Sequence, residues 1–180
     1  MNIGILDYWV SRGFCLGAGD GYNDACVQQA VALCLGEELS DHPSCVNQYV
    51  SYLARKLNDC FWSTDLVRAA GISDLAYEQL GSLGIDEKQF EQDICTAFIK
   101  ELLPDLSGWW GAGDSKRWLY DSSASRQTSL SIFMKDGSLY LCNIAGDYDG
   151  FLRKCSTVIL KCLRDAKERA GLKLFNREDY

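Results

Sequence analysis

The sequence predicts an α+β protein: a bundle of about five helices, then a small antiparallel β-meander and a C-terminal amphipathic helix. Apolar residues recur at helical spacing through most of the first hundred positions. Residues 128–144 instead alternate around an Asp-Gly pair, and residues 151–166 return to helical spacing. We therefore expect a helical part with an N-terminal arm at 1–105 and a second part at 106–180, packed as one unit.

The first elements are defined by glycines and by residues that cap helices. Residues 1–14 are apolar enough for a short strand or an arm packed on the body. A glycine loop follows, after which Asn23 or Asp24 is the expected cap of a helix over about 24–35. Gly36 stands where helices usually end.

The other helices of the bundle are expected over about 43–58, 64–71, 73–81 and 86–103. Ser40 and Asp41 offer a cap before the first of them. Gly71 interrupts the pattern and separates the next two. Asp86 caps the last one, and Pro104 ends it.

The second part is predicted to begin with a β-hairpin. Residues 128–134 form the first strand, Asp136-Gly137 the tight turn, and residues 138–144 the returning strand. Residues 117–121 add a third strand to the meander. Asp149 and Gly150 then start the final helix, which buries one apolar face.

Composition narrows the class of protein. The chain has 180 residues with 47% hydrophobic and 24% charged, which is ordinary for a globular protein. A net charge of −7 argues against general nucleic-acid binding, and no apolar run approaches the roughly 20 residues of a membrane helix. The N-terminal residues do not form a signal peptide, and the nine cysteines are an odd number. Reduced thiols in the cytoplasm are therefore expected.

Charge is distributed unevenly along the chain. Residues 151–180 contain eight Lys or Arg against four Asp or Glu, so this end is basic and the rest is strongly acidic. Such a basic end can bind an acidic partner or the acidic body of another copy, which makes a homo-oligomer one alternative. The other interpretation is an ordinary solvated helix face.

The first candidate site is a cysteine hydrolase dyad of Cys26 and His42, with Asp41 or Asp24 orienting the imidazole. The helix dipole stabilises a thiolate in a first helical turn, and His42 is the only histidine. However, Cys26 starts the first helix and His42 follows its end. A dozen helical residues rise about 18 Å, whereas catalytic partners lie about 3 Å apart. The dyad is therefore kept only as an alternative.

Cys34, His42 and Cys45 form an alternative metal site at the closed end of the predicted helical hairpin. Thiolates and imidazole are suitable zinc ligands. Their spacing matches no standard zinc arrangement, and both cysteines also fit the apolar faces of their helices. The leading prediction therefore contains no metal and no other cofactor.

Two segments are candidates for binding an anion or a nucleotide. The glycine loop at 17–24 leads into a helix start, where free amides bind negative groups, but it lacks the spacing of known phosphate loops. The connector at 105–127 combines aromatic faces for stacking with basic side chains. Its recognition surface is predicted to consist of Trp109, Trp110, Lys116, Arg117 and Trp118. The alternative is that the tryptophans fill the seam between bundle and meander.

Asp147 and Asp149 form the last candidate, because paired carboxylates can bind a hard cation. Two acids without further ligands make a weak site. The favoured interpretation is that Asp149 caps the final helix.

Residues 17 to about 100 resemble a loose set of uncharacterised bacterial and phage proteins. The resemblance rests on Ala25-Cys26-Val27, Ala30-Val31-Ala32, Gly36-Glu37, Ser40-Asp41-His42-Pro43, Cys45-Val46 and Leu57-Asn58-Asp59. It implies no activity, and it suggests a phage or mobile-element origin.

Taken together, the sequence predicts a small, acidic, non-catalytic binding protein of the cytoplasm. Its partner would be a host protein or a small anionic, nucleotide-like ligand, and neither nucleic acid in general nor a membrane. The alternatives are a cysteine-dependent hydrolase and an oligomer held by the basic final helix.

Overall fold

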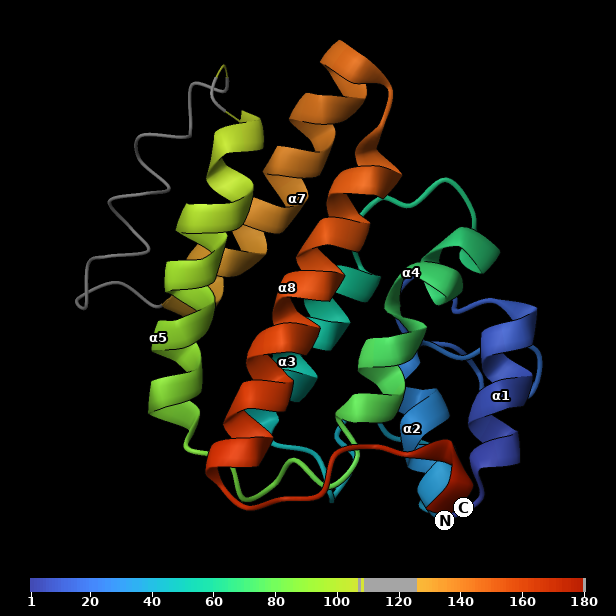
Figure 1. The fold of residues 1–180 in the computed structure, drawn as a ribbon. Coiled ribbons are helices and arrows are strands. Elements are labelled where there is room, and N and C mark those ends of the chain that lie inside the picture. The colour runs from blue at the N-terminus through green and yellow to red at the C-terminus, as the bar shows by residue number, and fades with distance from the viewer. Residues whose placement is uncertain (107, 109–125, 180) are drawn as a thin grey trace.

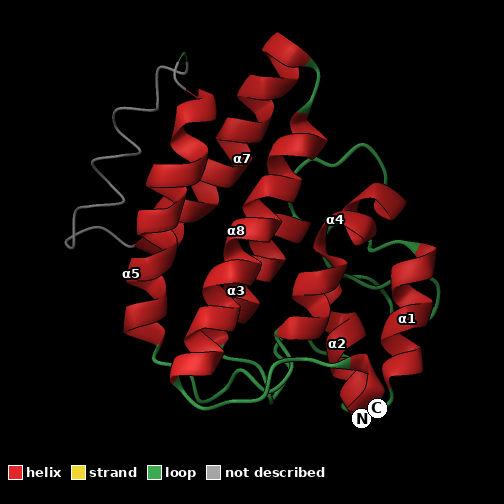
Figure 2. Cartoon of the chain, viewed as in Figure 1, coloured by secondary structure: helices red, strands yellow, loops and turns green. Residues whose placement is uncertain are grey.

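The computed structural model describes residues 1–106, 108 and 126–179 (Figure 1). These residues form seven α-helices and no strand, as Figure 2 shows. In chain order the elements are α1 Ile3–Arg12, α2 Val27–Leu35, α3 Gln48–Asn58, α4 Asp65–Glu78, α5 Glu87–Ala97, the π-helix η1 Phe98–Leu102, the 3-10 helix η2 Leu103–Leu106, α7 Arg126–Ala145, α8 Tyr148–Arg169 and the 3-10 helix η3 Arg177–Asp179. None of the described helices is both long and apolar enough to cross a membrane.

Helix α8 lies at the centre of the bundle. Figure 1 shows α5 and α7 on one side of it and α4 on the other, and α8 contacts all three. Its predicted apolar face is confirmed: eight apolar side chains of this face are buried, namely Phe151, Leu152, Cys155, Val158, Ile159, Cys162, Leu163 and Ala166. Burying a large apolar side chain stabilises the fold by about 1.5–3 kcal/mol, so this helix organises the core.

The predicted β-meander is wrong, and with it the α+β class. The segment forms the 20-residue helix α7. Its buried residues Leu130, Phe133, Met134, Gly137 and Ser138 stand three or four positions apart, which is helical spacing. The alternation of apolar residues between 130 and 134 mimicked a strand because it is too short to separate the two periods.

Gly137 explains why an Asp-Gly pair does not turn the chain here. A Cβ atom at this position would lie 2.9 Å from Leu106 Cδ1 and 3.0 Å from Phe151 Cε1. The glycine therefore allows α7 to approach α8 and η2 closely. The pair favours a hairpin locally, but packing of α7 against its neighbours outweighs that preference.

Two further predictions in the N-terminal half are corrected. The segment 1–14 contains helix α1, Ile3–Arg12, and is not a strand or an arm; Asn2 caps the helix by accepting from the Gly4 amide at 3.1 Å. The helices predicted on either side of Gly71 are one helix, α4. Gly71 is needed for close packing, because a Cβ there would lie 2.4 Å from the Trp62 ring.

Some of the residues predicted to cap or end helices do so, and others do not. Gly36 ends α2 in the left-handed conformation (φ 77°), and Asp86 caps α5, as predicted. Helix α2 begins after Cys26, so neither Asn23 nor Asp24 caps it. Likewise Asn47 caps α3, in place of the expected Ser40 and Asp41. Helical structure also continues past the expected end of the fifth helix, because Pro104 lies within η2.

The basic C-terminal residues are engaged within the chain. Seven of the eight Lys and Arg side chains after position 150 form ion pairs with acidic side chains of the residues that the structure describes. The innermost pair joins Lys167 and Glu78, each with a side chain only 1% exposed, at 2.9 Å. The positive charge of this end is therefore largely compensated by the bundle that it packs against.

The residues after α8 bring the two termini together, as Figure 1 shows. Phe175 stacks on Tyr77 with ring centroids 5.1 Å apart, and its amide donates to Glu78 at 3.1 Å. Arg177 forms an ion pair with Asp7 of α1. The tail thus covers the C-terminal end of α4.

Candidate functional site

The amides of the glycine loop are bonded to side chains of the chain itself. Asp20 Oδ1 accepts from the amides of Asn23 at 2.7 Å and Tyr22 at 2.8 Å, and these bonds lower the pKa of Asp20 to about 2. Gln29 Oε1 accepts from Gly19 at 2.7 Å and Cys26 at 3.1 Å. An external anion would have to displace these oxygens, so the loop is not an open anion site.

Cys26 and His42 have different surroundings. Cys26 is only 4% exposed at the start of α2, and burial raises the pKa of its thiol. The His42 side chain is 64% exposed, and its Nε2 lies 3.2 Å from Asp41 and 3.3 Å from Arg55 Nη1. Among the described residues no hydrogen bond joins the thiol to the imidazole. The structure brings His42 and Asp41 together, but places the thiol in the core.

The Asp41 carboxylate forms an ion pair with the Arg55 side chain. Its Oδ2 accepts from Arg55 Nη1 at 2.8 Å. Burial raises the pKa of Asp41, but the ion pair with Arg55 outweighs burial and lowers it below the ordinary value. The Asp41 carboxylate therefore bonds mainly to Arg55 and is the more distant partner of the His42 imidazole.

The cysteines of the alternative metal site also differ in exposure. Cys34 is fully buried, and burial raises the pKa of its thiol, whereas Cys45 is half-buried and His42 is exposed. Within the described part of the chain, no group of three His, Cys, Asp or Glu side chains is arranged to hold a metal ion.

The acidic pair before α8 has structural partners. Asp147, and not Asp149 as predicted, caps the helix by accepting from the Gly150 amide at 2.9 Å. Asp149 accepts from the Ser63 amide at 3.1 Å and so attaches α8 to the connection before α4. Each carboxylate is therefore engaged in holding the fold, Asp147 within its own helix and Asp149 between two segments.

The predicted recognition surface lies outside the described residues. This holds for all five of its members: Trp109, Trp110, Lys116, Arg117 and Trp118.

A groove in the described part of the chain offers a second candidate surface, which we call the α4–α7 groove. It has a volume of about 470 Å³. Its walls are Leu16, which directly precedes the glycine loop, the α3–α4 connection, the first turn of α4 and the middle of α7. The lining residues are Leu16, Asp59, Cys60, Phe61, Trp62, Ser63, Thr64, Asp65, Arg68, Lys135 and Leu139.

Three large apolar side chains of this groove face solvent. Leu16 is 60% exposed, Phe61 61% and Leu139 42%. They come from three separate segments, yet they line one hollow. Clustered exposed apolar side chains mark interaction surfaces more often than scattered ones do.

The floor of the groove is rigidly held. Trp62 is 4% exposed, and its indole donates to the Leu57 carbonyl at 2.9 Å. Cys60 is 2% exposed, and burial raises the pKa of its thiol to about 12. The thiol is therefore protonated at neutral pH and is not a nucleophile.

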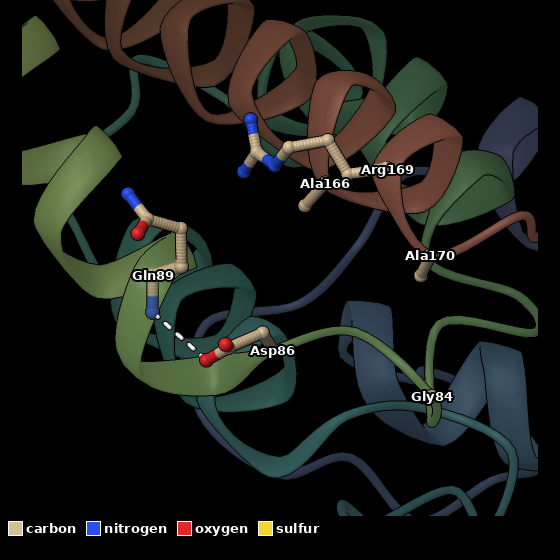
Figure 3. A pocket seen from close by; sticks show the side chains of 6 residues that line it. All are labelled: Gly84, Asp86, Gln89, Ala166, Arg169 and Ala170. Carbon is tan, nitrogen blue, oxygen red and sulfur yellow. Dashed lines mark hydrogen bonds between the residues drawn. The ribbon is translucent and has the colours of Figure 1, made fainter.

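A smaller pocket lies between the start of α5 and the end of α8, drawn in Figure 3. Its volume is about 340 Å³, and Gly84, Asp86, Gln89 and Arg169 are among its lining residues. Figure 3 shows that Asp86 turns toward the Gln89 amide, which it caps at 3.0 Å. Arg169 is paired with Asp93. The polar groups of this pocket thus already have partners.

No protein-family model, curated protein or solved structure matches this chain. The resemblance to bacterial and phage proteins therefore stays a prediction.

Sequence reasoning missed the α4–α7 groove because its residues are far apart in the chain. One signal was present: Phe61 and Trp62 interrupt a short polar connection between two helices. Leu139 gave no signal, because it was assigned to a strand that does not form.

Proposed function

We propose that this chain is a non-catalytic binding protein that recognises a partner protein through the α4–α7 groove. The observation that carries the proposal is the meeting of Leu16, Phe61 and Leu139, all exposed, around one hollow. Large apolar side chains gathered at one hollow are typical anchors of a protein–protein interface.

The buried thiols support binding over catalysis. Burial raises the pKa of Cys15, Cys60 and Cys162 to about 12 and raises that of Cys26 and Cys34 as well. Catalytic thiols require the opposite shift, since the thiolate is the nucleophile. The only imidazole is exposed and stands beside the Asp41–Arg55 pair.

The wider setting of this function remains as the sequence predicts it. We place the protein in the cytoplasm, as a phage or mobile-element accessory protein whose partner belongs to the host. A protein partner is favoured over a small nucleotide-like ligand, since the exposed apolar side chains of the groove suit side-chain contacts.

Co-purification with matched variants tests the proposal. The tagged full chain, the groove variant Phe61→Ser with Leu139→Ser, and the control Tyr22→Ser with Leu83→Ser are expressed in the source cells. Tyr22 and Leu83 are 87% and 63% exposed, and neither lines the groove. We expect a protein that the wild type and the control retain and that the groove variant loses by about 30-fold, as for interface hot spots.

A parallel variant, Arg117→Ala with Trp118→Ala, tests the connector as the recognition surface. Loss of the partner in this variant alone would move recognition to the connector and refute the groove. Retention in all three variants would refute both surfaces.

A further inference from the structure

The charges that line the α4–α7 groove are unequally matched. Asp65 is paired with Arg68, and Asp59 Oδ1 accepts from the Gly17 amide at 3.2 Å. Lys135, exposed on the α7 wall, forms no ion pair with any residue that the structure describes. The groove therefore contains two charged groups outside any described ion pair: Asp59, which accepts from an amide, and Lys135, whose ammonium has no partner among the described residues.

Arg68 adds a donor at the floor of the groove. Its side chain is 5% exposed, and its Nη1 donates to the Phe14 carbonyl at 2.6 Å and to Asp65. Its Nε is buried and has no hydrogen-bond partner within residues 1–106 and 126–179. A buried donor without a partner is costly, and a carboxylate is the acceptor that the guanidinium fork binds best.

Building on the proposed function, we infer that the groove binds a segment of its partner protein in which a large apolar side chain stands beside a carboxylate. The apolar side chain contacts Leu16, Phe61 and Leu139, and the carboxylate faces Lys135, the exposed cation of the groove. A segment of this kind pairs with the free ammonium of Lys135 and covers the exposed apolar side chains of the groove at the same time.

A singly charged carboxylate suits this site better than a phosphate. Asp59 and Asp65 also line the groove, and the chain as a whole carries a net charge of −7. Repulsion from these acids grows with the charge of the ligand, so a doubly charged group gains less from one free lysine.

Two peptides test the inference on the full-length chain labelled with ¹⁵N: acetyl-Gly-Asp-Leu-Phe-Gly-amide and its analogue with Asn in place of Asp. NMR titration at low salt reports both location and affinity. We expect amide shifts concentrated at Leu16, Phe61 and Leu139. The Asp peptide should bind about 2- to 5-fold more tightly, the size expected of one surface charge pair, and added salt should shrink the difference.

Variant Lys135→Gln assigns that preference to a single side chain. It should abolish the preference for the Asp peptide while both peptides still bind. Lys88→Gln is the matched control, because Lys88 is also exposed but lies on α5 outside the groove. This control should keep the full preference.

Equal affinity of the two peptides, or a preference that survives Lys135→Gln, would overturn the assignment of a carboxylate. Shifts outside the groove, or no binding of either peptide at millimolar concentration, would overturn the inference as well. The proposed function is judged separately, by the co-purification of the groove variant.

Discussion

An ion pair with a buried cation lies near each end of helix α4, and the surroundings of the two pairs differ sharply. At its C-terminal end Glu78 pairs with Lys167, and both side chains are 1% exposed. Near its N-terminal end Arg68 is 5% exposed, but its partner Asp65 is 60% exposed. One pair is enclosed on both sides, and the other stands at the wall of the α4–α7 groove.

The two pairs also differ in how fully they are bonded. Lys167 Nζ donates to the Glu78 carboxylate and to the carbonyls of Glu78 and Leu80, at 2.9 to 3.1 Å. The amide of Phe175 adds a further bond to Glu78. Arg68 in contrast has an unpartnered Nε. The Lys167 ammonium therefore has all its donors engaged, whereas the Arg68 guanidinium keeps one buried donor without a partner.

The largest effect is expected from Lys167→Met. It removes the buried cation of the Glu78 carboxylate and leaves Arg164, which is 49% exposed and lies 3.0 Å away, as its ionic partner. Breaking a buried pair costs about 3–5 kcal/mol, and because the pair with Arg164 remains, we expect a loss of about 3 kcal/mol. Urea denaturation measures the loss, with Lys154→Met as control. Lys154 forms an exposed pair with Asp105 and should cost about 0–1 kcal/mol. A loss of under 1 kcal/mol for Lys167→Met would show that this end is not sealed.

A smaller loss is expected from Arg68→Met. The substitution leaves the Phe14 carbonyl without its donor, which costs about 1–3 kcal/mol. It leaves no charge in the core, because Asp65 is exposed and regains water. The same urea series compares both variants, and a loss equal to that of Lys167→Met would erase the distinction between the two ends of α4.

A titration effect of about 1 kcal/mol is expected from Cys60 at pH 10. Burial raises the pKa of this thiol from 9.0 to about 12. The stability that the buried neutral thiol gives the folded state is therefore complete below pH 9 and is lost as the pH rises toward 12. At pH 10 the unfolded thiol is ionised and the folded one is not, which favours unfolding. Stability curves of wild type and Cys60→Ala should therefore converge above pH 9. Parallel curves up to pH 10.5 would contradict a sealed groove floor.

The smallest effect on stability is expected from replacing the exposed apolar side chains of the α4–α7 groove. Phe61→Ser with Leu139→Ser should change the free energy of unfolding by about 1 kcal/mol or less, because Phe61 is already 61% exposed and Leu139 42% exposed. Thermal and urea unfolding check this. A loss above 2 kcal/mol would mean that these residues stabilise the fold, and would remove the argument that they are exposed for binding.

The helices were predicted correctly where the apolar residues follow helical spacing over a long stretch. The apolar face of α8 extends from Phe151 to Ala166, about four turns, so helical spacing could not be confused with any other. Local capping chemistry was recognised at Gly36 and Asp86. The same reasoning failed at Asp136-Gly137, where a strong turn signal is overruled by the close approach of Phe151.

The candidate site was predicted less well than the fold. Cys26, Cys34 and His42 were singled out by residue type, but a thiol's chemistry depends on burial, which residue type does not reveal. The groove was missed because Leu16, Phe61 and Leu139 are separated by dozens of residues.

What the sequence determined by itself is local: where most helices lie, which face of the last one is buried, and that the chain is acidic with a basic end. Tertiary structure alone decided the rest. It made α7 a helix, used Gly71 and Gly137 for packing, and assigned different roles to the two buried cations near the ends of α4. The physical reason is that these outcomes depend on which distant side chains share a site, and that choice is made by packing the whole core.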